Sequence, residues 1–171
     1  MTAHESIDAE GLAVHSPEAM ARAGAALAGA LQSGDVVAID GPLGAGKSVL
    51  VRGMAEGLSI DPSLVSSPTF VLMQRYAGPG LALVHADAYR VRSPQEFEAV
   101  GWSELISEPA TITAVEWASR ITELLPPDTV TIELDLPAPG EPSNLRRLRL
   151  TSSDVAQQLT LRTLLRTALN K

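Results

Sequence analysis

The most constraining feature of the sequence is a glycine-rich octapeptide, residues 41–48, which reads Gly-Pro-Leu-Gly-Ala-Gly-Lys-Ser. It matches G-x-x-x-x-G-K-[ST] at every fixed position and lies between a short apolar run, residues 36–39, and a helical pattern that starts at Lys47. Small residues let the backbone wrap an anion, and the helix adds its own free N–H groups. A plain glycine turn is the alternative, but the strand-to-helix context favours a phosphate-binding loop (P-loop).

The residues of this loop have separate expected roles towards a nucleoside triphosphate. We expect Lys47 to reach the β- and γ-phosphates and the Ser48 hydroxyl to be a ligand of Mg²⁺. Pro42 lacks an N–H, but it precedes the amides best suited to hold phosphate. The nucleotide contacts are expected from Gly41, Leu43, Gly44, Ala45, Gly46, Lys47, Ser48 and Val49.

Two acidic residues end apolar strand patterns and are candidates to act beside the loop. Asp87 follows Leu-Val-His-Ala, and Glu116 follows Ile-Thr-Ala-Val. Ligand sites in open α/β sheets lie beyond the carboxyl ends of the strands, so both acids reach the site if their strands run parallel to the loop's strand. We therefore expect Asp87 and Glu116 to act in metal binding and catalysis, rather than as carboxylates in water. Asp40, just before the loop, is expected to be a solvated or capping acid.

The segment between the loop's helix and the next strand has the position of a switch-like segment. Within it, Thr69 is a candidate to contact the γ-phosphate or its attacking water, although Ser-Pro-Thr is also ordinary turn chemistry. His85, inside an apolar strand pattern, is expected to be a core histidine with its hydrogen bonds satisfied rather than a ligand. The segment 93–108 carries four glutamates with Phe97 and Trp102, which favours a solvated helix face over an acidic partner-facing element.

The rest of the chain predicts one α/β domain over residues 11–171, after a flexible N-terminal tail over residues 1–10. A hydroxyl cap and a proline start the first helix at Ser16-Pro17, and Ser33-Gly34 breaks it. The expected strands cover residues 36–39, 70–76, 81–86, 111–115, 130–136 and 146–150, and further helices begin at Lys47, Ser93 and Asp154 and after Glu116.

Two pairs of these strands are expected to form antiparallel hairpins, residues 70–86 and residues 130–150. The Ser93-Pro94-Gln95-Glu96 stretch has the spacing of a capping box. The sum is a P-loop-type three-layer sandwich, with a mixed, mostly parallel central sheet flanked by helices.

Composition excludes several classes of protein. The 171 residues include 13 Lys and Arg against 20 Asp and Glu, a formal net charge of −7, which argues against a chain that grips RNA or DNA by itself. The absence of cysteine excludes disulfides, thiolate metal sites and cysteine nucleophiles. There is no signal-peptide pattern and no apolar run of about 18 residues, so a cytoplasmic protein is expected. No N-K-x-D motif is present, which favours adenine over guanine.

Four blocks together carry a family resemblance: residues 41–48, Ser67-Pro68-Thr69, the His-Ala-Asp-Ala-Tyr-Arg of residues 85–90, and Val115-Glu116-Trp117. Their order and spacing resemble the TsaE (YjeE) family from about Ser16 to the end of the chain. The resemblance implies a small P-loop ATPase that supports formation of N6-threonylcarbamoyladenosine at position 37 of tRNAs reading ANN codons. It implies ATP or ADP with Mg²⁺, weak partner-regulated hydrolysis, and action on a complex of a TsaD-like transferase and a TsaB-like protein, with tRNA contacted only indirectly and no membrane.

Carried onto this chain, the resemblance makes Lys47 the phosphate-holding lysine, and Ser48 and Glu116 the magnesium ligands. Asp87 is similar to the family's Walker-B-type acid and a further candidate ligand. Trp117 is similar to the neighbour that shapes the nucleotide site.

Ser16, at the start of the first helix, resembles the part of the family that lies near the nucleotide base. The chain departs from the family at Pro42, where an acid is usual, at Ser48, where threonine is more frequent, and at Asp40, where apolar residues are common. Two other functions stay open: a small-metabolite kinase, and a subunit that switches on nucleotide occupancy without hydrolysis.

Overall fold

A computed structural model describes residues 11–68 and 70–171. The predictions of a flexible tail over residues 1–10 and of a catalytic Thr69 lie outside the described residues. In chain order the elements, with η marking 3₁₀ helices, are β1 (Leu12–Val14), α2 (Pro17–Ala28), β2 (Val36–Asp40), α3 (Lys47–Gly57), η1 (Pro62–Leu64), β3 (Met73–Tyr76), β4 (Ala82–Asp87), α4 (Pro94–Ala99), α5 (Trp102–Ile106), β5 (Thr111–Glu116), η2 (Ala118–Leu124), β6 (Val130–Asp135), β7 (Arg146–Thr151) and α6 (Val155–Leu169).

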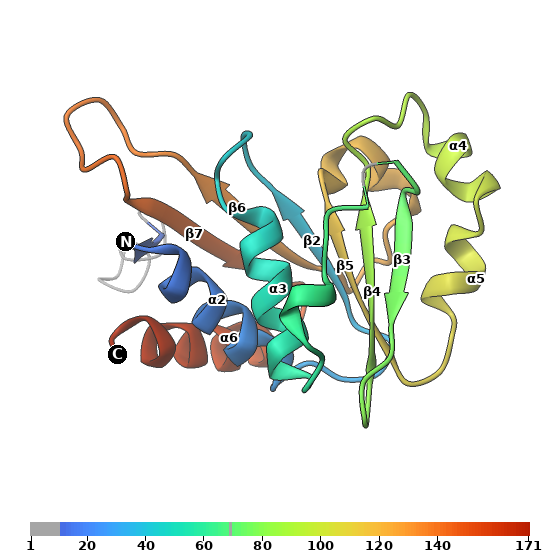
Figure 1. The fold of residues 1–171 in the computed structure, drawn as a ribbon, viewed down its shortest axis with the longest axis horizontal. Helices are drawn as coiled ribbons and strands as arrows, with labels where there is room; N and C mark the ends of the chain where they lie inside the picture. Colours follow the sequence, from blue (N-terminus) through green and yellow to red (C-terminus); the bar gives the residue numbers. More distant parts are fainter. Residues whose placement is uncertain (1–10, 69) are drawn as a thin grey trace.

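The described strands form one seven-stranded sheet in the order β1-β7-β6-β2-β5-β4-β3 (Figure 1). The four central strands β6, β2, β5 and β4 are parallel, and β7 and β3 pair antiparallel with their neighbours. The mixed sheet and both predicted hairpins are therefore confirmed. Because β4 runs parallel to β5, and β5 to β2, the carboxyl ends of these three strands lie at the same edge of the sheet as the P-loop.

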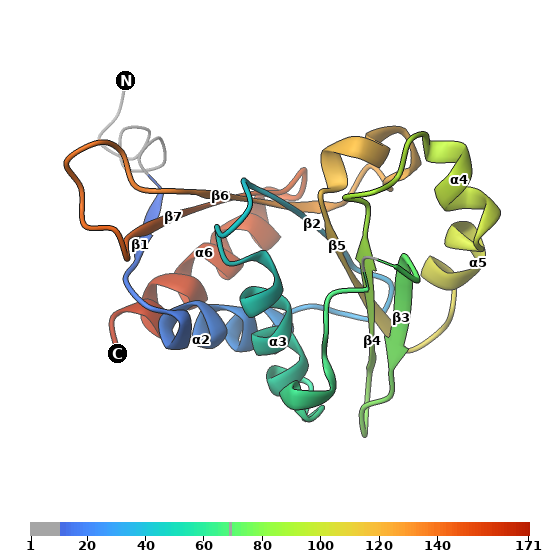
Figure 2. The ribbon, with the colours of Figure 1, turned by 45° about the horizontal axis from the view of Figure 1, so that its top comes forward.

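Helices cover both faces of the sheet, which confirms the three-layer architecture (Figure 2). The alternation of strand β2 shows this directly, because its consecutive side chains point to opposite faces. Val37 and Ile39 belong to the core cluster that includes residues of α2, α3 and α6. Val36 and Ala38 belong to a second cluster that includes residues of α4, α5 and η2. Strand β2 is thus buried on both faces, as a central parallel strand must be.

Helices α2 and α3 pack almost backbone to backbone. A Cβ placed on Gly53 would lie 2.0 Å from the carbonyl oxygen of Ala21, and one on Gly24 would lie 2.1 Å from that of Leu50. Only glycine fits at such contacts, so these glycines fix the position of α3 against α2. The predicted cap of α2 is confirmed, because the Ser16 hydroxyl oxygen accepts a hydrogen bond of 3.1 Å from the Ala19 N–H.

Strand β3 is shorter than the prediction of residues 70–76. Residues before Met73 form a turn, in which the N–H groups of Val71 and Leu72 donate to the carbonyl oxygen of Pro68. Leu72 has a φ of +65°, outside the extended region, and the Phe70 side chain is 83% exposed. The turn therefore takes the first half of the predicted strand out of the sheet.

Two predicted helices differ in the structure. The helix expected after Glu116 is the 3₁₀ helix η2, which begins after Trp117 with a φ of +58° and is kinked at Ile121. The helix expected at Ser93 is split into α4 and α5, with Gly101 between them at a φ of +92°. The prediction of a capping box at Ser93 is wrong, because the Ser93 side chain makes no capping hydrogen bond.

The N-terminal part of the fold differs from the prediction in two respects, whereas the start of the last helix agrees with it. Helix α2 ends at Ala28 rather than at Ser33-Gly34, because the turn that follows begins at Gly29. Strand β1 was not predicted, since three residues on a sheet edge carry too short a pattern. The predicted start of the last helix is confirmed, with Asp154 accepting from the N–H of Ala156 at 2.8 Å.

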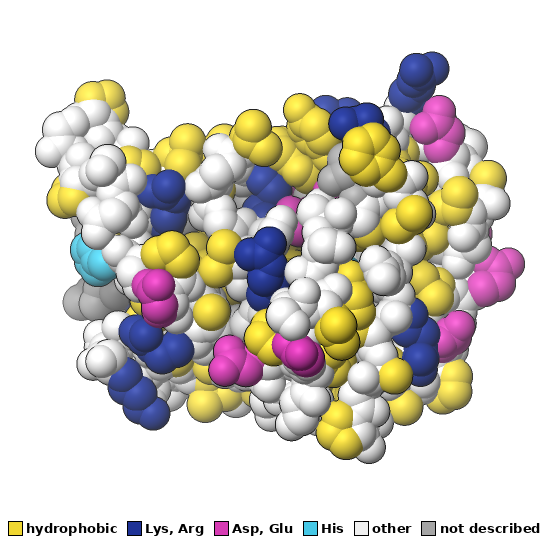
Figure 3. All heavy atoms as spheres, in the orientation of Figure 1, with side chains coloured by type: hydrophobic (Ala, Val, Ile, Leu, Met, Phe, Trp, Pro, Cys, Tyr) yellow, Lys and Arg dark blue, Asp and Glu magenta, His cyan; other side chains and the backbone are white. Residues whose placement is uncertain are grey.

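The surface in the view of Figure 3 mixes basic, acidic and hydrophobic side chains, with no single basic patch on that face. This distribution agrees with the negative net charge of −7. No helix among residues 11–68 and 70–171 is long and apolar enough to cross a membrane.

Candidate functional site

The P-loop connects β2 to the N-terminus of α3, as the motif predicts. Its glycines have backbone angles that other residues rarely adopt, with φ of +149° at Gly41, +80° at Gly44 and +103° at Gly46. A Cβ on Gly41 would also lie 2.4 Å from the carbonyl oxygen of Leu134. The first-turn N–H groups of α3 have no intrahelical acceptor, so the loop ends at a set of free donors suited to an anion.

Lys47, the first residue of α3, is buried and folds back over the loop. Its Nζ donates to the carbonyl oxygens of Gly41 at 2.6 Å and Pro42 at 2.9 Å, and lies 3.8 Å from the centre of the Trp117 ring. Burial lowers the pKa of Lys47, while the charges of Glu116, and less strongly Asp87 and Asp40, act in the opposite direction. The ammonium group is therefore held by weak neutral acceptors that a phosphate oxygen can replace.

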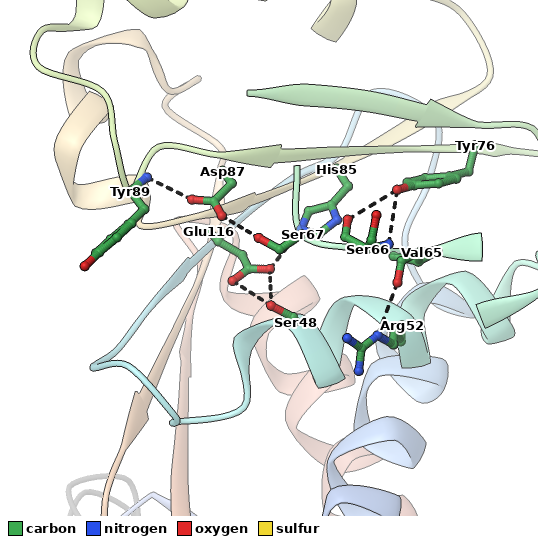
Figure 4. Close-up of polar contacts among 10 residues, drawn as sticks. All are labelled: Ser48, Arg52, Val65, Ser66, Ser67, Tyr76, His85, Asp87, Tyr89 and Glu116. Carbon is green, nitrogen blue, oxygen red and sulfur yellow. Dashed lines mark hydrogen bonds and ion pairs between the residues drawn. The ribbon is translucent and has the colours of Figure 1, made fainter. Parts of the chain in front are cut away.

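Ser48 and Glu116 meet at the end of β5 (Figure 4). The Ser48 hydroxyl donates to Glu116, with Oγ 2.8 Å from Oε1 and 3.1 Å from Oε2. Donating the proton leaves the oxygen lone pairs of Ser48 available to a cation. Glu116 is the last residue of β5 and is buried, so its orientation is set by these contacts rather than by solvent.

Asp87, the last residue of β4, lies beside Glu116 because the two are register partners in the parallel pair β4–β5. Its contacts differ from those of Glu116. The Ser67 hydroxyl donates to Asp87 Oδ2 at 2.6 Å, and the Tyr89 N–H donates to Oδ1 at 2.8 Å (Figure 4). The structure thus brings both predicted acids to the P-loop, but ties Asp87 to the segment that precedes Thr69.

A cavity of about 520 Å³ opens over these groups. The Tyr89 and Trp117 rings lie 5.0 Å apart between centres along its wall. Sequence reasoning placed Ser67 in the Ser67-Pro68-Thr69 block without giving it a role, and it did not identify Arg52, which belongs to no motif. The lining residues are Leu43, Gly44, Gly46, Lys47, Ser48, Val49, Arg52, Ser67, Asp87, Tyr89, Arg90, Glu116 and Trp117.

A second cavity, of about 310 Å³, lies on the other side of the same loop. The predicted Ser16 is among its lining residues, and Gly44, Gly46 and Val49 line both cavities. The phosphate loop therefore separates two spaces, one above the acids and one beside the start of α2. The residues around the second cavity are Ser16, Pro17, Met20, Gly44, Ala45, Gly46, Val49, Asn144 and Arg146.

Sequence reasoning missed Asn144, near the end of the β6–β7 connection, and Arg146, the first residue of β7. Arg146 donates from Nε and from Nη2 to the carbonyl oxygen of Gly44, each at 3.2 Å. Asn144 Nδ2 donates to the carbonyl oxygen of His15 at 2.8 Å, immediately before α2. These contacts join residues 102 and 129 positions apart along the chain, so no local pattern predicts them.

The remaining predicted residues take different places. Leu43 is 77% exposed on the outside of the loop, and Ala45 is fully buried beneath it. Asp40 was expected to be either a solvated or a capping acid, and it is a capping acid. Its carboxylate accepts hydrogen bonds from the N–H and the hydroxyl of Ser119 near the start of η2. His85 is buried as predicted, and its Nε2 lies 2.8 Å from Glu116 Oε1. The expectation that its hydrogen bonds are satisfied is wrong, because Nδ1 has no partner within residues 11–68 and 70–171.

The donor set of this site fits a magnesium–nucleotide complex. Among residues 11–68 and 70–171, no group of three His, Cys, Asp or Glu side chains is arranged to hold a metal ion. Mg²⁺ in nucleotide sites uses one or two protein oxygens and completes its shell with phosphate and water oxygens. The Ser48 hydroxyl and the Glu116 carboxylate, which converge at 2.8 Å, are an oxygen-only pair of this kind, with Asp87 alongside.

Comparisons with known proteins identify the family. The family model of the "Threonylcarbamoyl adenosine biosynthesis protein TsaE" matches residues 14–141. The tRNA threonylcarbamoyladenosine biosynthesis protein TsaE of Treponema pallidum is 38% identical over 125 residues, which are 73% of this chain and 90% of that protein. The protein of the same description from Streptomyces coelicolor is 35% identical over 135 residues, 77% of this chain and 89% of its own.

A solved structure has the same fold. The crystal structure of Bacillus subtilis YdiB superposes with a TM-score of 0.68 at 28% sequence identity, and the match covers 91% of this chain and 93% of YdiB. The family match begins just before α2 and includes the P-loop, both acids and Trp117. This chain therefore belongs to the TsaE family of threonylcarbamoyl adenosine biosynthesis proteins.

Proposed function

We propose that this chain, as one ATPase domain over residues 11–171, binds ATP with Mg²⁺ over residues 41–48 and hydrolyses it slowly. The cycle supports formation of N6-threonylcarbamoyladenosine at position 37 of tRNAs that read ANN codons. The observation that carries the proposal is the convergence of Lys47, Ser48 and Glu116 on one side of the P-loop, with Ser48 Oγ 2.8 Å from Glu116 Oε1. Membership of the TsaE family assigns the chain to threonylcarbamoyl adenosine biosynthesis.

Phosphate binding is the part of the proposal that rests most directly on the loop. The free N–H groups at the start of α3 and the Lys47 ammonium group bind the phosphate oxygens, and Lys47 leaves the carbonyl oxygens of Gly41 and Pro42 to do so. Ser48 and Glu116, with Asp87 as a further candidate, hold Mg²⁺. When bound, this ion neutralises charge that develops on the phosphate oxygens.

Asp87 has the second chemical role. Its carboxylate, held by the Ser67 hydroxyl and the Tyr89 N–H, lies in the same cavity as Lys47 and borders the segment that contains Thr69. We assign Asp87 and Thr69 to orienting the attacking water. Trp117 closes one wall of this cavity and contacts Lys47.

The second cavity is the proposed place of the nucleoside. It begins at the loop residues Gly44 and Gly46 and extends to Ser16 at the start of α2, so a nucleotide whose phosphates occupy the loop reaches it. The absence of an N-K-x-D motif favours ATP or ADP over guanine nucleotides.

The partners proposed are a TsaD-like transferase and a TsaB-like protein in the cytoplasm. The net charge of −7 argues that tRNA is held by these partners rather than by this chain. ATP binding and hydrolysis then act on the complex, and the partners set the rate.

The ATPase activities of Lys47→Ala and Glu116→Ala test the proposal. Both variants are expected to lose at least about tenfold in turnover, because each removes a charged group from the phosphate and metal site. Glu108→Ala is the matched control, since the Glu108 side chain forms an exposed ion pair with Arg75. Wild-type turnover in both site variants would overturn the assignment, and phosphate found on a metabolite instead of as free phosphate would indicate a kinase.

A further inference from the structure

Glu116, the acid proposed to bind Mg²⁺, has a second neighbour that the P-loop motif does not include. The His85 side chain has no solvent exposure, and its Nε2 lies 2.8 Å from Glu116 Oε1. Its other ring nitrogen, Nδ1, is buried and has no hydrogen-bond partner among residues 11–68 and 70–171. Burying an imidazole with one nitrogen unpaired lowers the stability of the fold. Such groups are uncommon in proteins, which suggests that His85 has a role at the site.

The sheet places His85 and Glu116 on the same face, the one that α3 covers. Leu83, His85 and Asp87 alternate onto the same face of β4, and His85 is the register partner of Ala114, two residues before Glu116 on β5. Ser48 approaches the carboxylate from α3, and His85 approaches it from β4 (Figure 4). Two elements of regular structure therefore hold one carboxylate between them.

The chemistry of the contact fixes which atom carries the hydrogen. A carboxylate that binds Mg²⁺ is ionised and only accepts hydrogen bonds, so in the proposed site the His85 Nε2 is the donor of the 2.8 Å contact. Oε1 of Glu116 receives this bond together with the one from Ser48, whose single hydrogen is shared between Oε1 and Oε2. The hydrogen bond from Ser48 does not distinguish the two carboxylate oxygens, whereas the bond from His85 is made to Oε1.

We propose that His85 is a positioning residue for the magnesium–nucleotide site, acting through Glu116. Its Nε2–H holds Oε1 and thereby fixes the rotation of the carboxylate, so that the Ser48 hydroxyl and the Glu116 oxygens are presented to the ion as a preformed pair. This inference rests on the proposed function. Side chains that orient a metal-binding carboxylate in this way are typically worth 10- to 100-fold in affinity or activity.

The test compares three substitutions at one position. His85→Leu removes the donor and keeps an apolar side chain of similar size in a fully buried place. His85→Gln restores an amide N–H at about the reach of Nε2, whereas His85→Asn places its amide at the shorter reach of Nδ1. We expect ATP affinity in the presence of Mg²⁺ to fall about tenfold in the Leu and Asn variants and to stay within about threefold in Gln. In excess chelator, all four proteins are expected to bind ATP equally.

Thermal unfolding and a nitrogen-15 spectrum complete the experiment. Gln and Asn are both polar in the same buried place, so equal unfolding midpoints with unequal Mg²⁺-dependent affinity identify positioning rather than folding. In nucleotide-free wild type, the His85 ring is expected to show a hydrogen-bonded Nε2–H that is lost in Glu116→Ala. A spectrum in which the ring hydrogen is on Nδ1 and not on Nε2 would overturn the proposal, regardless of the ATP affinities of the variants.

The two proposals fail differently. A wild-type protein that binds ATP with Mg²⁺, and a folded His85→Leu that binds it equally well, would contradict only the role of His85. A wild-type protein that binds no ATP with Mg²⁺ would contradict the proposed function and, with it, the role of His85.

Discussion

The carboxyl ends of β5 and β4 carry the two acids of the site, and they are built in different ways. Glu116 and Asp87 are register partners, yet Glu116 is held by Ser48 on α3 and His85 on β4, which are both regular elements. Asp87 is held by the Ser67 hydroxyl and the Tyr89 N–H, which both belong to irregular segments. We therefore expect Glu116 to be the more rigid acid, suited to the proposed metal–nucleotide complex, and Asp87 to depend on the position of a loop.

The supports behind each acid strengthen this contrast. Helix α3 is fixed against α2 by glycine contacts, as at Gly53. Residues 65 and 66, in the connection before β3, make single side-chain bonds: Arg52 Nε donates to the Val65 carbonyl oxygen at 3.2 Å, and the Tyr76 hydroxyl bonds the backbone of Ser66. Such a segment opens more readily than a packed helix.

The largest effect is expected where the support of the Glu116 side is broken. In Gly53→Ala the new Cβ would lie 2.0 Å from the carbonyl oxygen of Ala21, so α3 must move. We expect the free energy of unfolding to fall by about 3 kcal/mol or more, measured by denaturant titration. Gly80→Ala is the control, because a Cβ there meets nothing within 4 Å. Equal losses in the two variants would contradict the tight α2–α3 contact.

Neutral isosteres separate the two acids. Glu116→Gln is expected to lower ATP affinity in the presence of Mg²⁺ about 100-fold, because the charge beside Ser48 is lost. Asp87→Asn is expected to keep this affinity within about threefold and to lower ATP turnover about tenfold. Calorimetric titration and a phosphate-release assay measure the two quantities. The same pattern in both variants would remove the distinction between a metal-binding and a water-orienting acid.

A smaller effect is expected from the loop that holds Asp87. Ser67→Ala removes the 2.6 Å bond to Asp87 and is expected to lower turnover about threefold, with an unfolding free energy reduced by about 1 kcal/mol. Ser63→Ala is a matched control, since it removes a similar 2.7 Å bond from a serine to Asp61 in the same connection, away from the site. Unchanged turnover in Ser67→Ala would show that Asp87 does not depend on this loop.

The smallest expected effect concerns Lys47, which faces both acids. Because burial lowers its pKa below the usual 10.5, the unfolded chain binds more protons than the folded one between the two values. The free energy of unfolding of the wild type should therefore rise with pH as 10.5 is approached, relative to Lys47→Met. Denaturant unfolding of both proteins between pH 8 and pH 10.5 measures this difference. A difference that stays constant with pH would contradict the shift.

The predictable part of the molecule was its local chemistry. The P-loop between β2 and α3, the Ser16 cap and the hairpins are encoded in contiguous patterns, and the strand-end rule brought Asp87 and Glu116 to the loop. Because β4 and β5 run parallel to each other and β5 runs parallel to β2, the acids at the ends of β4 and β5 lie at the same edge of the sheet as the P-loop.

The remaining features depend on which strands are neighbours and on backbone turns. The His85–Glu116 and Arg146–Gly44 contacts exist because β4 lies beside β5 and because the start of β7 lies near the loop, and neither contact has a local signature. The shortening of β3 results from a turn that ends at Leu72 with a φ of +65°. A strand pattern over residues 70–76 does not reveal such a turn.

The most direct test of the central claim is a reconstituted modification assay with a TsaD-like transferase, a TsaB-like partner, threonylcarbamoyl donor and tRNA. With ATP and Mg²⁺, the wild-type chain is expected to sustain multiple rounds of threonylcarbamoyladenosine formation, and Glu116→Gln is expected to lose that stimulation. A chain that stimulates the partners equally well without ATP, or with Lys47 and Glu116 both replaced, would contradict the account. Full stimulation by a variant that binds ATP but does not hydrolyse it would restrict the role to nucleotide occupancy.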